Sequence, residues 1–253
     1  MNHSLASSTW TQVPSRALVL VPVGAIEQHG PHLPLDTDTV IADAVARRVA
    51  DHLHRRDVLV ASPVTYGSSG EHQAFPGTVS VGTEALAHLL VELTRSLGSW
   101  ADRVVFINAH GGNTTALTRA VTQLISEGHD AAWVPCATED VDAHAGYTET
   151  CLMLHLRPWD VRLHRAEPGN TTPLNELLPT LTSAGVRAVT TNGVLGDPTG
   201  ASAGAGKRVL EAMIDDITQL IDTGRPGDTG LLRASAVPAT ATNSSASRAH
   251  QNA

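Results

Sequence analysis

The sequence has few aromatic residues and more acidic than basic charge, and these shortages exclude one class of partner. Aromatic residues make up 3% of the 253 residues, and 17 Lys and Arg stand against 25 Asp and Glu, for a formal net charge of −8. Binding to nucleic acid normally needs a basic patch and side chains on which bases stack. We therefore expect no nucleic-acid partner.

Cysteine and long apolar runs are also scarce. The two cysteines, Cys136 and Cys151, are too few for a disulfide framework, and the N-terminus lacks the basic and apolar regions of a secretory signal. The longest apolar stretch, residues 17–26, is about half of the roughly 20 residues that a membrane-spanning helix needs. We expect a cytoplasmic protein with no membrane partner.

Histidine, by contrast, is frequent. The chain has 13 His beside 25 Asp and Glu, and 42% of its residues are hydrophobic. Imidazoles together with carboxylates, in a chain poor in cysteine, are typical of catalytic metal sites and not of thiolate structural sites. The composition thus indicates a globular protein with a sizeable core, and the positions of the histidines decide whether they form a site.

Apolar runs rich in β-branched residues alternate with longer segments of helical period. This alternation predicts a single α/β domain with a mostly parallel β-sheet flanked by helices. We expect strands at 17–23, 58–61, 103–108 and 131–135, and helices at 39–54, 83–100, 114–127, 148–156 and 205–222. The composition indicates a flexible N-terminus at 1–14, the folded domain at 15–225, and a low-complexity, disordered tail at 226–253.

The first expected strand runs into a segment with acidic and imidazole side chains. In an extended chain, Glu27 and His29 are two residues apart and project to the same side. Two prolines and Gly30 turn the chain, so that Asp38 can return toward them. A plainer interpretation is a loop whose acidic residues, Asp36 or Asp38, stabilise the N-terminus of the next helix.

A second candidate follows the third expected strand. His110 comes shortly after residues 104–107 and directly before a Gly-Gly-Asn turn, at the carboxyl end of that strand. Ligands bind at this edge in open α/β sheets. The plainer alternative is a glycine-rich tight turn with a solvated histidine.

A third cluster, residues 142–150, precedes another expected helix and contains His144 and Glu149. The first turn of a helix favours an anion, which gives Glu149 a structural reason to be there. Several carboxylates in one cleft would repel and raise each other's pKa unless cations were bound. Two divalent metals that share a bridging carboxylate resolve that conflict.

Three strings of the sequence resemble the signatures of the creatininase family of amidohydrolases. They are PVGAIEQHGPHLPLDTD at 22–38, NAHGGN at 108–113 and HAGYTET at 144–150, and the resemblance extends over roughly 16–222. It implies a three-layer α/β sandwich, a homo-oligomer, and two divalent metal ions at the carboxyl edge of the sheet. Zn, Mn and Fe(II) all suit mixed imidazole and carboxylate ligands.

The resemblance also implies roles for single residues. The implied metal ligands, with Asp38 bridging, are Glu27, His29, Asp38, His110 and Glu149. His144 and Glu149 would form the proton-transfer machinery, and Glu71 and His72 would line the substrate cleft.

One departure from the family concerns the second signature. Creatininase proper has His-Tyr-Glu where this chain has His110, Gly111 and Gly112, so one carboxylate ligand and one aromatic substrate contact are absent. Creatinine is therefore a doubtful substrate. We infer that Glu149 supplies the missing carboxylate.

Within the family, residues 66–73, 169–174 and 193–199 are similar to the mycofactocin-system members. This similarity implies a peptidase that uses a metal-activated water to release the modified C-terminal Val-Tyr-derived unit from a precursor peptide. Two alternatives stay open: an amidohydrolase of a small cyclic amide or formamide, and a scaffold that binds a metal or ligand without catalysis. A closed structural metal site is the weakest choice, because such sites normally use thiolates.

Overall fold

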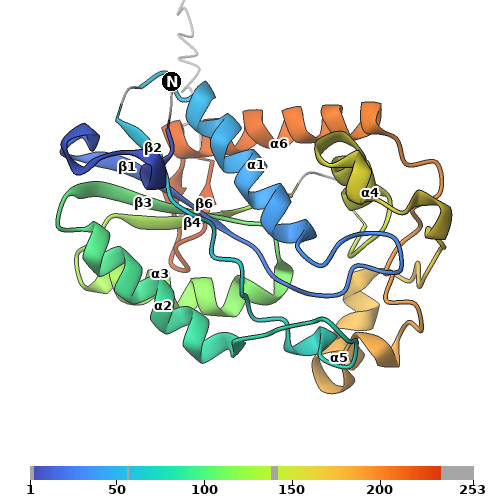
Figure 1. The fold of residues 1–253 in the computed structure, drawn as a ribbon. Helices are drawn as coiled ribbons and strands as arrows, with labels where there is room; N and C mark the ends of the chain where they lie inside the picture. The colour runs from blue at the N-terminus through green and yellow to red at the C-terminus, as the bar shows by residue number, and fades with distance from the viewer. Residues whose placement is uncertain (1–2, 56, 138–141, 235–253) are drawn as a thin grey trace, which may run out of the picture.

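The chain folds around a parallel β-sheet of four strands, shown in the computed structural model of Figure 1, which describes residues 3–55, 57–137 and 142–234. The strand order is β2-β1-β3-β4, and every neighbouring pair is parallel. The strands are β1 (Ala17–Val23), β2 (Val58–Val60), β3 (Ala101–Asn108) and β4 (Ala131–Pro135). The α/β fold with a parallel sheet is thus confirmed, and the bounds of β1 and β4 agree with those predicted.

Helices cover both faces of the sheet and make three layers (Figure 1). α1 (Thr37–His52), α4 (Tyr147–Leu156) and α6 (Ala203–Thr223) lie on one face, and α2 (Gly82–Leu97) and α3 (Thr114–Ser126) lie on the other. Successive side chains of a strand point to opposite sides. Leu18 and Leu20 therefore pack toward α1 and α6, whereas Val19 and Val21 pack toward α2 and α3. All five predicted helices are present, with ends shifted by up to three residues.

The helix α5 (Leu174–Ala184) lies outside the predicted set. Its apolar residues have helical spacing, but Pro179 inside the helix removes a backbone donor and disfavours the α conformation. Packing of Leu177 and Leu181 in a small apolar cluster with Val186 offsets that cost. Short 3₁₀ helices occupy Leu5–Ser7, Trp10–Gln12, Gly70–His72, Gly111–Asn113, Pro158–Asp160, Leu163–Arg165 and Val186–Ala188.

Both ends of the described chain pack onto the sheet. The main-chain N–H of Val60 donates to the carbonyl of His3 at 2.7 Å, so the N-terminal segment, predicted to be flexible, begins beside β2. At the other end, β5 (Arg225–Pro226) and β6 (Leu232–Arg233) form an antiparallel hairpin that packs against β4. The domain boundary predicted at 225 falls inside this hairpin, and residues 235–253 of the predicted tail lie outside the described residues. None of the helices in the described ranges is both long and apolar enough to span a bilayer.

The strand order creates a topological switch point between β1 and β3. From β1 the chain crosses to β2 on one side, and from β2 it returns to β3 on the other side of β1. The loops that leave the carboxyl ends of β1 and β3 therefore diverge, and the crevice between such loops is where open α/β sheets bind ligands. The segments after Val23 and after Asn108 both start there.

Gly206 marks a close approach of α6 to α4, the helix that carries Glu149. A Cβ at Gly206 would overlap the carbonyl of Cys151, whereas a Cβ at Gly204 would meet nothing closer than Arg208 at 4.0 Å. We expect Gly206→Ala to lower the free energy of unfolding by about 1–3 kcal/mol through overpacking. The matched control Gly204→Ala should raise it by at most about 1 kcal/mol. Denaturant unfolding measures both, and a Gly206→Ala chain as stable as the wild type would contradict the prediction.

Candidate metal centre

The carboxyl ends of β1 and β3 bring the four metal ligands predicted from the first two motifs together. Glu27 and His29 follow β1, Asp38 stands in the first turn of α1, and His110 follows β3; all four are buried. His29 Nε2 lies 3.1 Å from Asp38 Oδ1, and His110 Nε2 lies 3.1 Å from Glu27 Oε2. His110 Nδ1 lies 3.6 Å from Asp38 Oδ2, so the two oxygens of Asp38 face two different imidazoles.

Helix capping does not account for Asp38. Asp36 occupies the N-cap position of α1 but makes no capping hydrogen bond with its side chain, and it accepts instead from Arg157 Nη1 at 3.0 Å. Asp38 turns its carboxylate away from the helix end and toward His29 and His110. The N-terminal field of α1 favours this anion, but the imidazoles determine where it points.

The third motif joins the cluster from the other side of the cleft. His144 is held by main-chain hydrogen bonds to Leu195, and its ring lies 4.3 Å from the ring of His29, centroid to centroid. Glu149, in the first turn of α4, places Oε2 3.8 Å from His29 Nε2 and accepts from the N–H of Ala145 at 2.6 Å. The structure therefore gathers the predicted residues of all three motifs.

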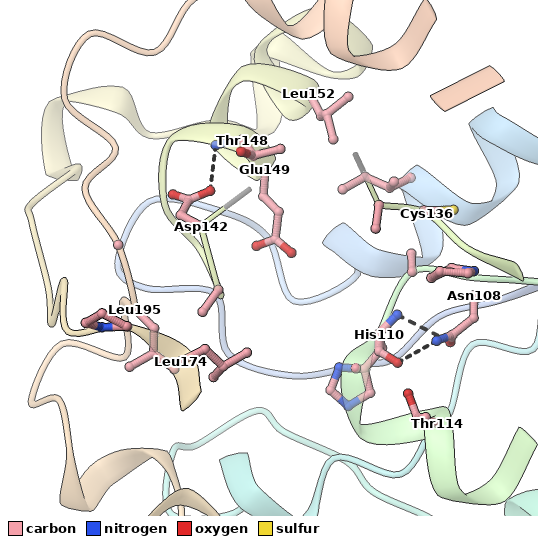
Figure 2. Close-up of a pocket in the computed structure, with 18 of the residues that line it drawn as sticks. Asn108, His110, Thr114, Cys136, Asp142, Thr148, Glu149, Leu152, Leu174 and Leu195 are labelled. Atoms are coloured by element: carbon pink, nitrogen blue, oxygen red, sulfur yellow. Dashed lines mark hydrogen bonds between the residues drawn. The ribbon is translucent and has the colours of Figure 1, made fainter. Parts of the chain in front are cut away.

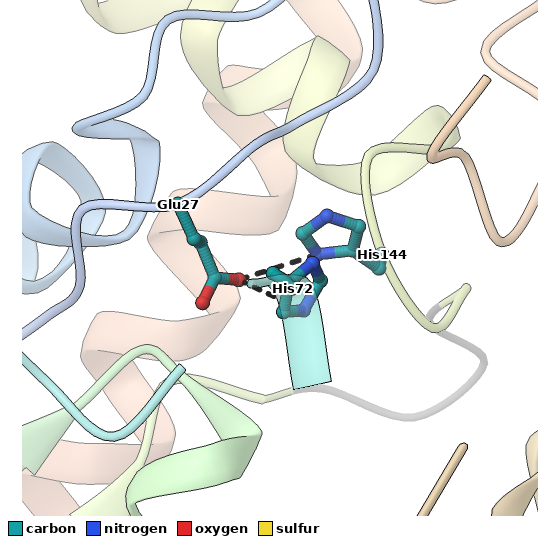
Figure 3. Close-up of side chains that lie close together, drawn as sticks. All are labelled: Glu27, His72 and His144. Atoms are coloured by element: carbon teal, nitrogen blue, oxygen red, sulfur yellow. Dashed lines mark ion pairs between the residues drawn. The ribbon is translucent and has the colours of Figure 1, made fainter. Parts of the chain in front are cut away.

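His72 lies closer to the cluster than the sequence analysis indicates. It stands in the 3₁₀ helix Gly70–His72, with Nε2 3.3 Å from Glu27 Oε1, and Figure 3 shows its ring beside that of His144. Its neighbour Glu71 places Oε1 3.5 Å from His110 Nε2. Both residues line a cavity beside the cluster. No spacing within this loop relates them to the ligands, because only the tertiary fold brings the loop there.

Two buried carboxylates in the cluster have oxygens without hydrogen-bond partners. Both side-chain oxygens of Glu27 and Oδ2 of Asp38 are buried without one. Three sets of potential ligand atoms each lie within 4.8 Å of one another: Glu27 with Asp38 and His110, His29 with His144 and Glu149, and Glu27 with His72 and His144. A buried carboxylate without a partner is costly. Divalent cations held by these oxygens and imidazoles would remove that cost, so the donor set fits a metal centre.

The imidazoles carry the compensating charge in the metal-free chain. Burial by itself would lower the pKa of His29, but Asp38, Glu149 and Glu27 outweigh it and raise that pKa to about 10. The pKa of His110 is also raised well above its usual value, because Glu27 in particular outweighs the effect of burial. Two imidazolium groups thus occupy the centre of the carboxylate cluster at neutral pH.

Glu149 differs from the other carboxylates. Burial, together with the nearby charge of Asp38, raises its pKa to about 7, although His29 opposes the shift. A carboxyl group with a pKa near neutrality can both hold and release a proton under working conditions. This property agrees with the proton-transfer role predicted for Glu149.

The cluster lies where two arms of a cleft meet. One arm, a cavity of about 620 Å³, includes Leu152 in its lining, and the other, of about 950 Å³, includes Glu71 and His72. His110 and Glu149 line both arms, and Figure 2 shows their side chains reaching the first cavity from different elements. An extended molecule could therefore lie in both arms with its middle at the cluster.

Substitution of the two glycines after His110 can test whether close packing around His110 matters for metal binding. A Cβ at Gly112 would overlap the carboxylate of Glu71, the ring of His110 and the carbonyl of Ser68, whereas a Cβ at Gly111 would meet nothing within 4 Å. We expect Gly112→Ala to weaken Zn²⁺ binding by about 10–100-fold, because it displaces groups that hold His110. Gly111→Ala is the matched control and should bind like the wild type in chelator competition. Equal affinities of the two variants would show that this packing is unimportant.

Comparison with known proteins assigns a family to this geometry. The chain matches the family described as Creatininase, creatinine amidohydrolase, over residues 6–221. It is 52% identical over 236 residues to the mycofactocin precursor peptide peptidase of Mycobacterium tuberculosis, with 90% of this chain and 94% of that protein covered.

Solved structures agree with this match. A mutant creatininase of Zn-Zn type has a TM-score of 0.72 at 26% identity, with 87% of this chain and 97% of that chain covered. The structure named Creatininase Mn has a TM-score of 0.70 at 27% identity, with 87% and 98% covered. Because the family match spans most of its length and a relative shares more than half of its residues, the chain belongs to the creatininase family.

Proposed function

We propose that the chain is a metal-dependent peptidase that hydrolyses an amide bond of the mycofactocin precursor peptide and releases its modified C-terminal Val-Tyr-derived unit. The observation that carries the proposal is the buried cluster of carboxylates and imidazoles, with unpartnered oxygens on Glu27 and Asp38, at the meeting point of the two arms of the cleft. The 52% identity to an enzyme of that name supports the choice of substrate.

Two divalent ions, Zn, Mn or Fe(II), fit the donor set. Glu27, Asp38 and His110 would hold one, and His29 and Glu149 would hold the other with Asp38 as the bridge, because its two oxygens face His29 and His110 separately. Bound divalent ions supply Lewis acidity and lower the pKa of water, which amide hydrolysis at neutral pH requires. Glu149 supplies the missing carboxylate in this proposal.

Proton transfer completes the proposed reaction. An amide nitrogen leaves readily only when it receives a proton. Glu149 lines both arms of the cleft, so it lies where it would give a proton to the departing amine. His144 stands beside it, with Nδ1 3.7 Å from Glu27 Oε1, and serves as the second proton-transfer group.

The size of the cleft favours a peptide over a small ring. Two adjoining cavities of about 620 and 950 Å³, both lined by His110 and Glu149, exceed what a cyclic amide or a formamide needs. Glu71 and His72 contact the substrate in the larger arm in this proposal. The proposal also retains the cytoplasmic location and the homo-oligomer expected from the sequence.

Metal uptake should release protons. At pH 7 His29, with a pKa of about 10, and His110, with a raised pKa, both carry a proton in the metal-free chain, and an imidazole must lose a proton before it binds metal. We expect at least about two protons to be released, one from each ring, with a further fraction from Glu149, whose pKa is about 7. The apparent metal affinity should rise with pH between 7 and 10. Calorimetry in buffers of different ionisation enthalpy measures the release. Metal uptake with no proton release would mean that these rings are not ligands.

A cleavage assay tests the proposed function directly. The metal-free protein is given Zn²⁺, Mn²⁺ or Fe(II) and offered the modified precursor peptide, creatinine and a formamidopyrimidine in parallel, with products measured by mass spectrometry. We expect a small C-terminal fragment of the peptide, lost on chelation and restored by metal. Turnover of only a small compound would change the substrate and keep the metal chemistry, and binding without any turnover would support a scaffold.

A further inference from the structure

Hydrogen bonds to the main chain fix which end of the Gln28 side-chain amide is the oxygen and which is the NH₂ group. Its Oε1 accepts from the N–H of Gly30 at 2.9 Å, and its Nε2 donates to the carbonyl of Gly193 at 3.0 Å. A main-chain N–H can only donate and a carbonyl can only accept, so the two ends of the amide cannot be exchanged. The NH₂ end therefore faces the imidazoles of His72 and His144.

Gly193 keeps the room for this amide. Its φ is +82°, a conformation that suits glycine, and a Cβ at this position would overlap the side-chain oxygen of Gln28. The backbone at Gly30 and Gly193 thus leaves room for the Gln28 side chain. Gln28 is buried, and its neighbours in the sequence are the two proposed ligands Glu27 and His29.

The main chain also decides which nitrogen of His144 carries hydrogen. His144 Nε2 lies 2.8 Å from the carbonyl of Gln28, which can only accept, so Nε2 carries the hydrogen and Nδ1 has the free lone pair. Gln28 Nε2 lies 3.1 Å from the same nitrogen, but two N–H groups cannot bond to each other. One amide hydrogen of Gln28 goes to Gly193, and the second goes to His72 Nδ1 at 2.9 Å.

In His72, Nδ1 is the nitrogen held by the Gln28 amide, and it accepts a hydrogen bond. A neutral imidazole has one N–H, so Nε2 carries the hydrogen. That nitrogen lies 3.3 Å from Glu27 Oε1 but makes no hydrogen bond to it. We propose, resting on the metal centre of the proposed function, that Gln28 holds His72 in the tautomer whose Nε2 carries the hydrogen, and so keeps His72 outside the set of metal ligands.

The two histidines assigned as ligands show the contrast. His29 Nδ1 lies 3.1 Å from the carbonyl of Glu27, and His110 Nε2 lies 3.1 Å from the carbonyl of Ser68. In each ring the nitrogen beside a carbonyl donates, and the other nitrogen faces Asp38 with a free lone pair once the ring is neutral. This is the arrangement in which metal-binding histidines are usually held. His72 lacks it, although its nitrogen lies within ligand distance of Glu27 and His144.

Metal affinity in three variants tests the proposal without any peptide substrate. His72→Gln and His72→Leu both remove the imidazole and leave the proposed ligands in place, whereas His110→Gln removes a proposed ligand. In Zn²⁺ competition against a chelator, we expect His72→Gln and His72→Leu to bind within about tenfold of the wild type, and His110→Gln to bind more than about 100-fold more weakly. A His72→Gln chain that loses one bound ion would overturn the proposal.

The protonation of His72 can also be read directly. Long-range ¹H–¹⁵N spectra of the Zn²⁺-loaded and metal-free chains should show an unprotonated Nδ1 and a protonated Nε2 at His72. Gln28→Glu replaces the donor by a group that can only accept, so the hydrogen of His72 should move to Nδ1. A metal-shifted Nε2, or a protonated Nδ1 in the wild type, would overturn the inference. A chain that binds no Zn²⁺ would instead overturn the proposed function.

Discussion

Asp38→Asn is expected to lower kcat/KM for peptide hydrolysis by about 10³-fold or more, a loss of about 4 kcal/mol of transition-state stabilisation. Asp38 gives one oxygen to the side of His29 and the other to the side of His110, so its loss affects both halves of the proposed metal centre. An amide in its place offers one neutral oxygen and one NH₂ group, which repels a cation. Peptide cleavage and bound metal are measured on the same preparation.

Asp36→Asn is the matched control, because Asp36 is the N-cap residue of α1, two positions before Asp38. Its carboxylate is 37% exposed and pairs with Arg157, and such surface pairs contribute at most about 1 kcal/mol. We expect this variant to keep the wild-type rate and metal content. Asp38→Asn should remain folded, because His29 can become neutral when its partner carboxylate is removed. A folded Asp38→Asn chain with full activity and both ions would reject the bridging role.

Most of the fold can be predicted from the sequence, because buried strands appear there as continuous runs of β-branched and aliphatic residues. Every residue of β1 is buried, so its run of β-branched and aliphatic residues has no ambiguity and its bounds were predicted correctly. The helix α5 was not predictable in the same way. Pro179 argues locally against a helix, and only packing against residues distant in the sequence reverses that preference.

The candidate site likewise has residues that local sequence patterns predict and residues that only the tertiary fold brings in. Glu27, His29 and His110 could be predicted as neighbours because the carboxyl ends of parallel strands meet at one edge of a sheet. His72 could not be placed beside Glu27, because the loop after β2 reaches the cluster only in the folded chain.

The carboxylate that replaces the family's third-position glutamate, absent here because Gly112 stands in its place, shows most clearly what the sequence alone cannot predict. The sequence analysis infers one replacement, Glu149, and the structure brings Glu149 to 3.8 Å from His29 Nε2. It also brings Glu71 to 3.5 Å from His110 Nε2, over the space that Gly112 leaves open. A glycine in a motif reveals that a side chain is absent, but it does not reveal which distant side chain occupies the space.

Glu149→Gln is expected to lower kcat by about 10²–10⁴-fold, the usual contribution of a positioned proton donor. Glutamine cannot give a proton to the departing amine, so the variant should lose this contribution at every pH. Glu176→Gln is the control, because Glu176 is also a first-turn glutamate but is exposed on α5.

Metal analysis of Glu149→Gln separates the two roles proposed for this carboxylate. A ligand that is lost should lower the number of bound ions from two toward one, because the remaining imidazole and the bridging Asp38 hold the second ion less firmly. Saturation with added metal should then restore the ion but not the rate, because the proton donor is still absent. If added metal restored the full rate, Glu149 would be a ligand only. His144, whose unprotonated Nδ1 faces Glu27 across the same cleft, would then have to take a proton from the attacking water and pass it to the amine.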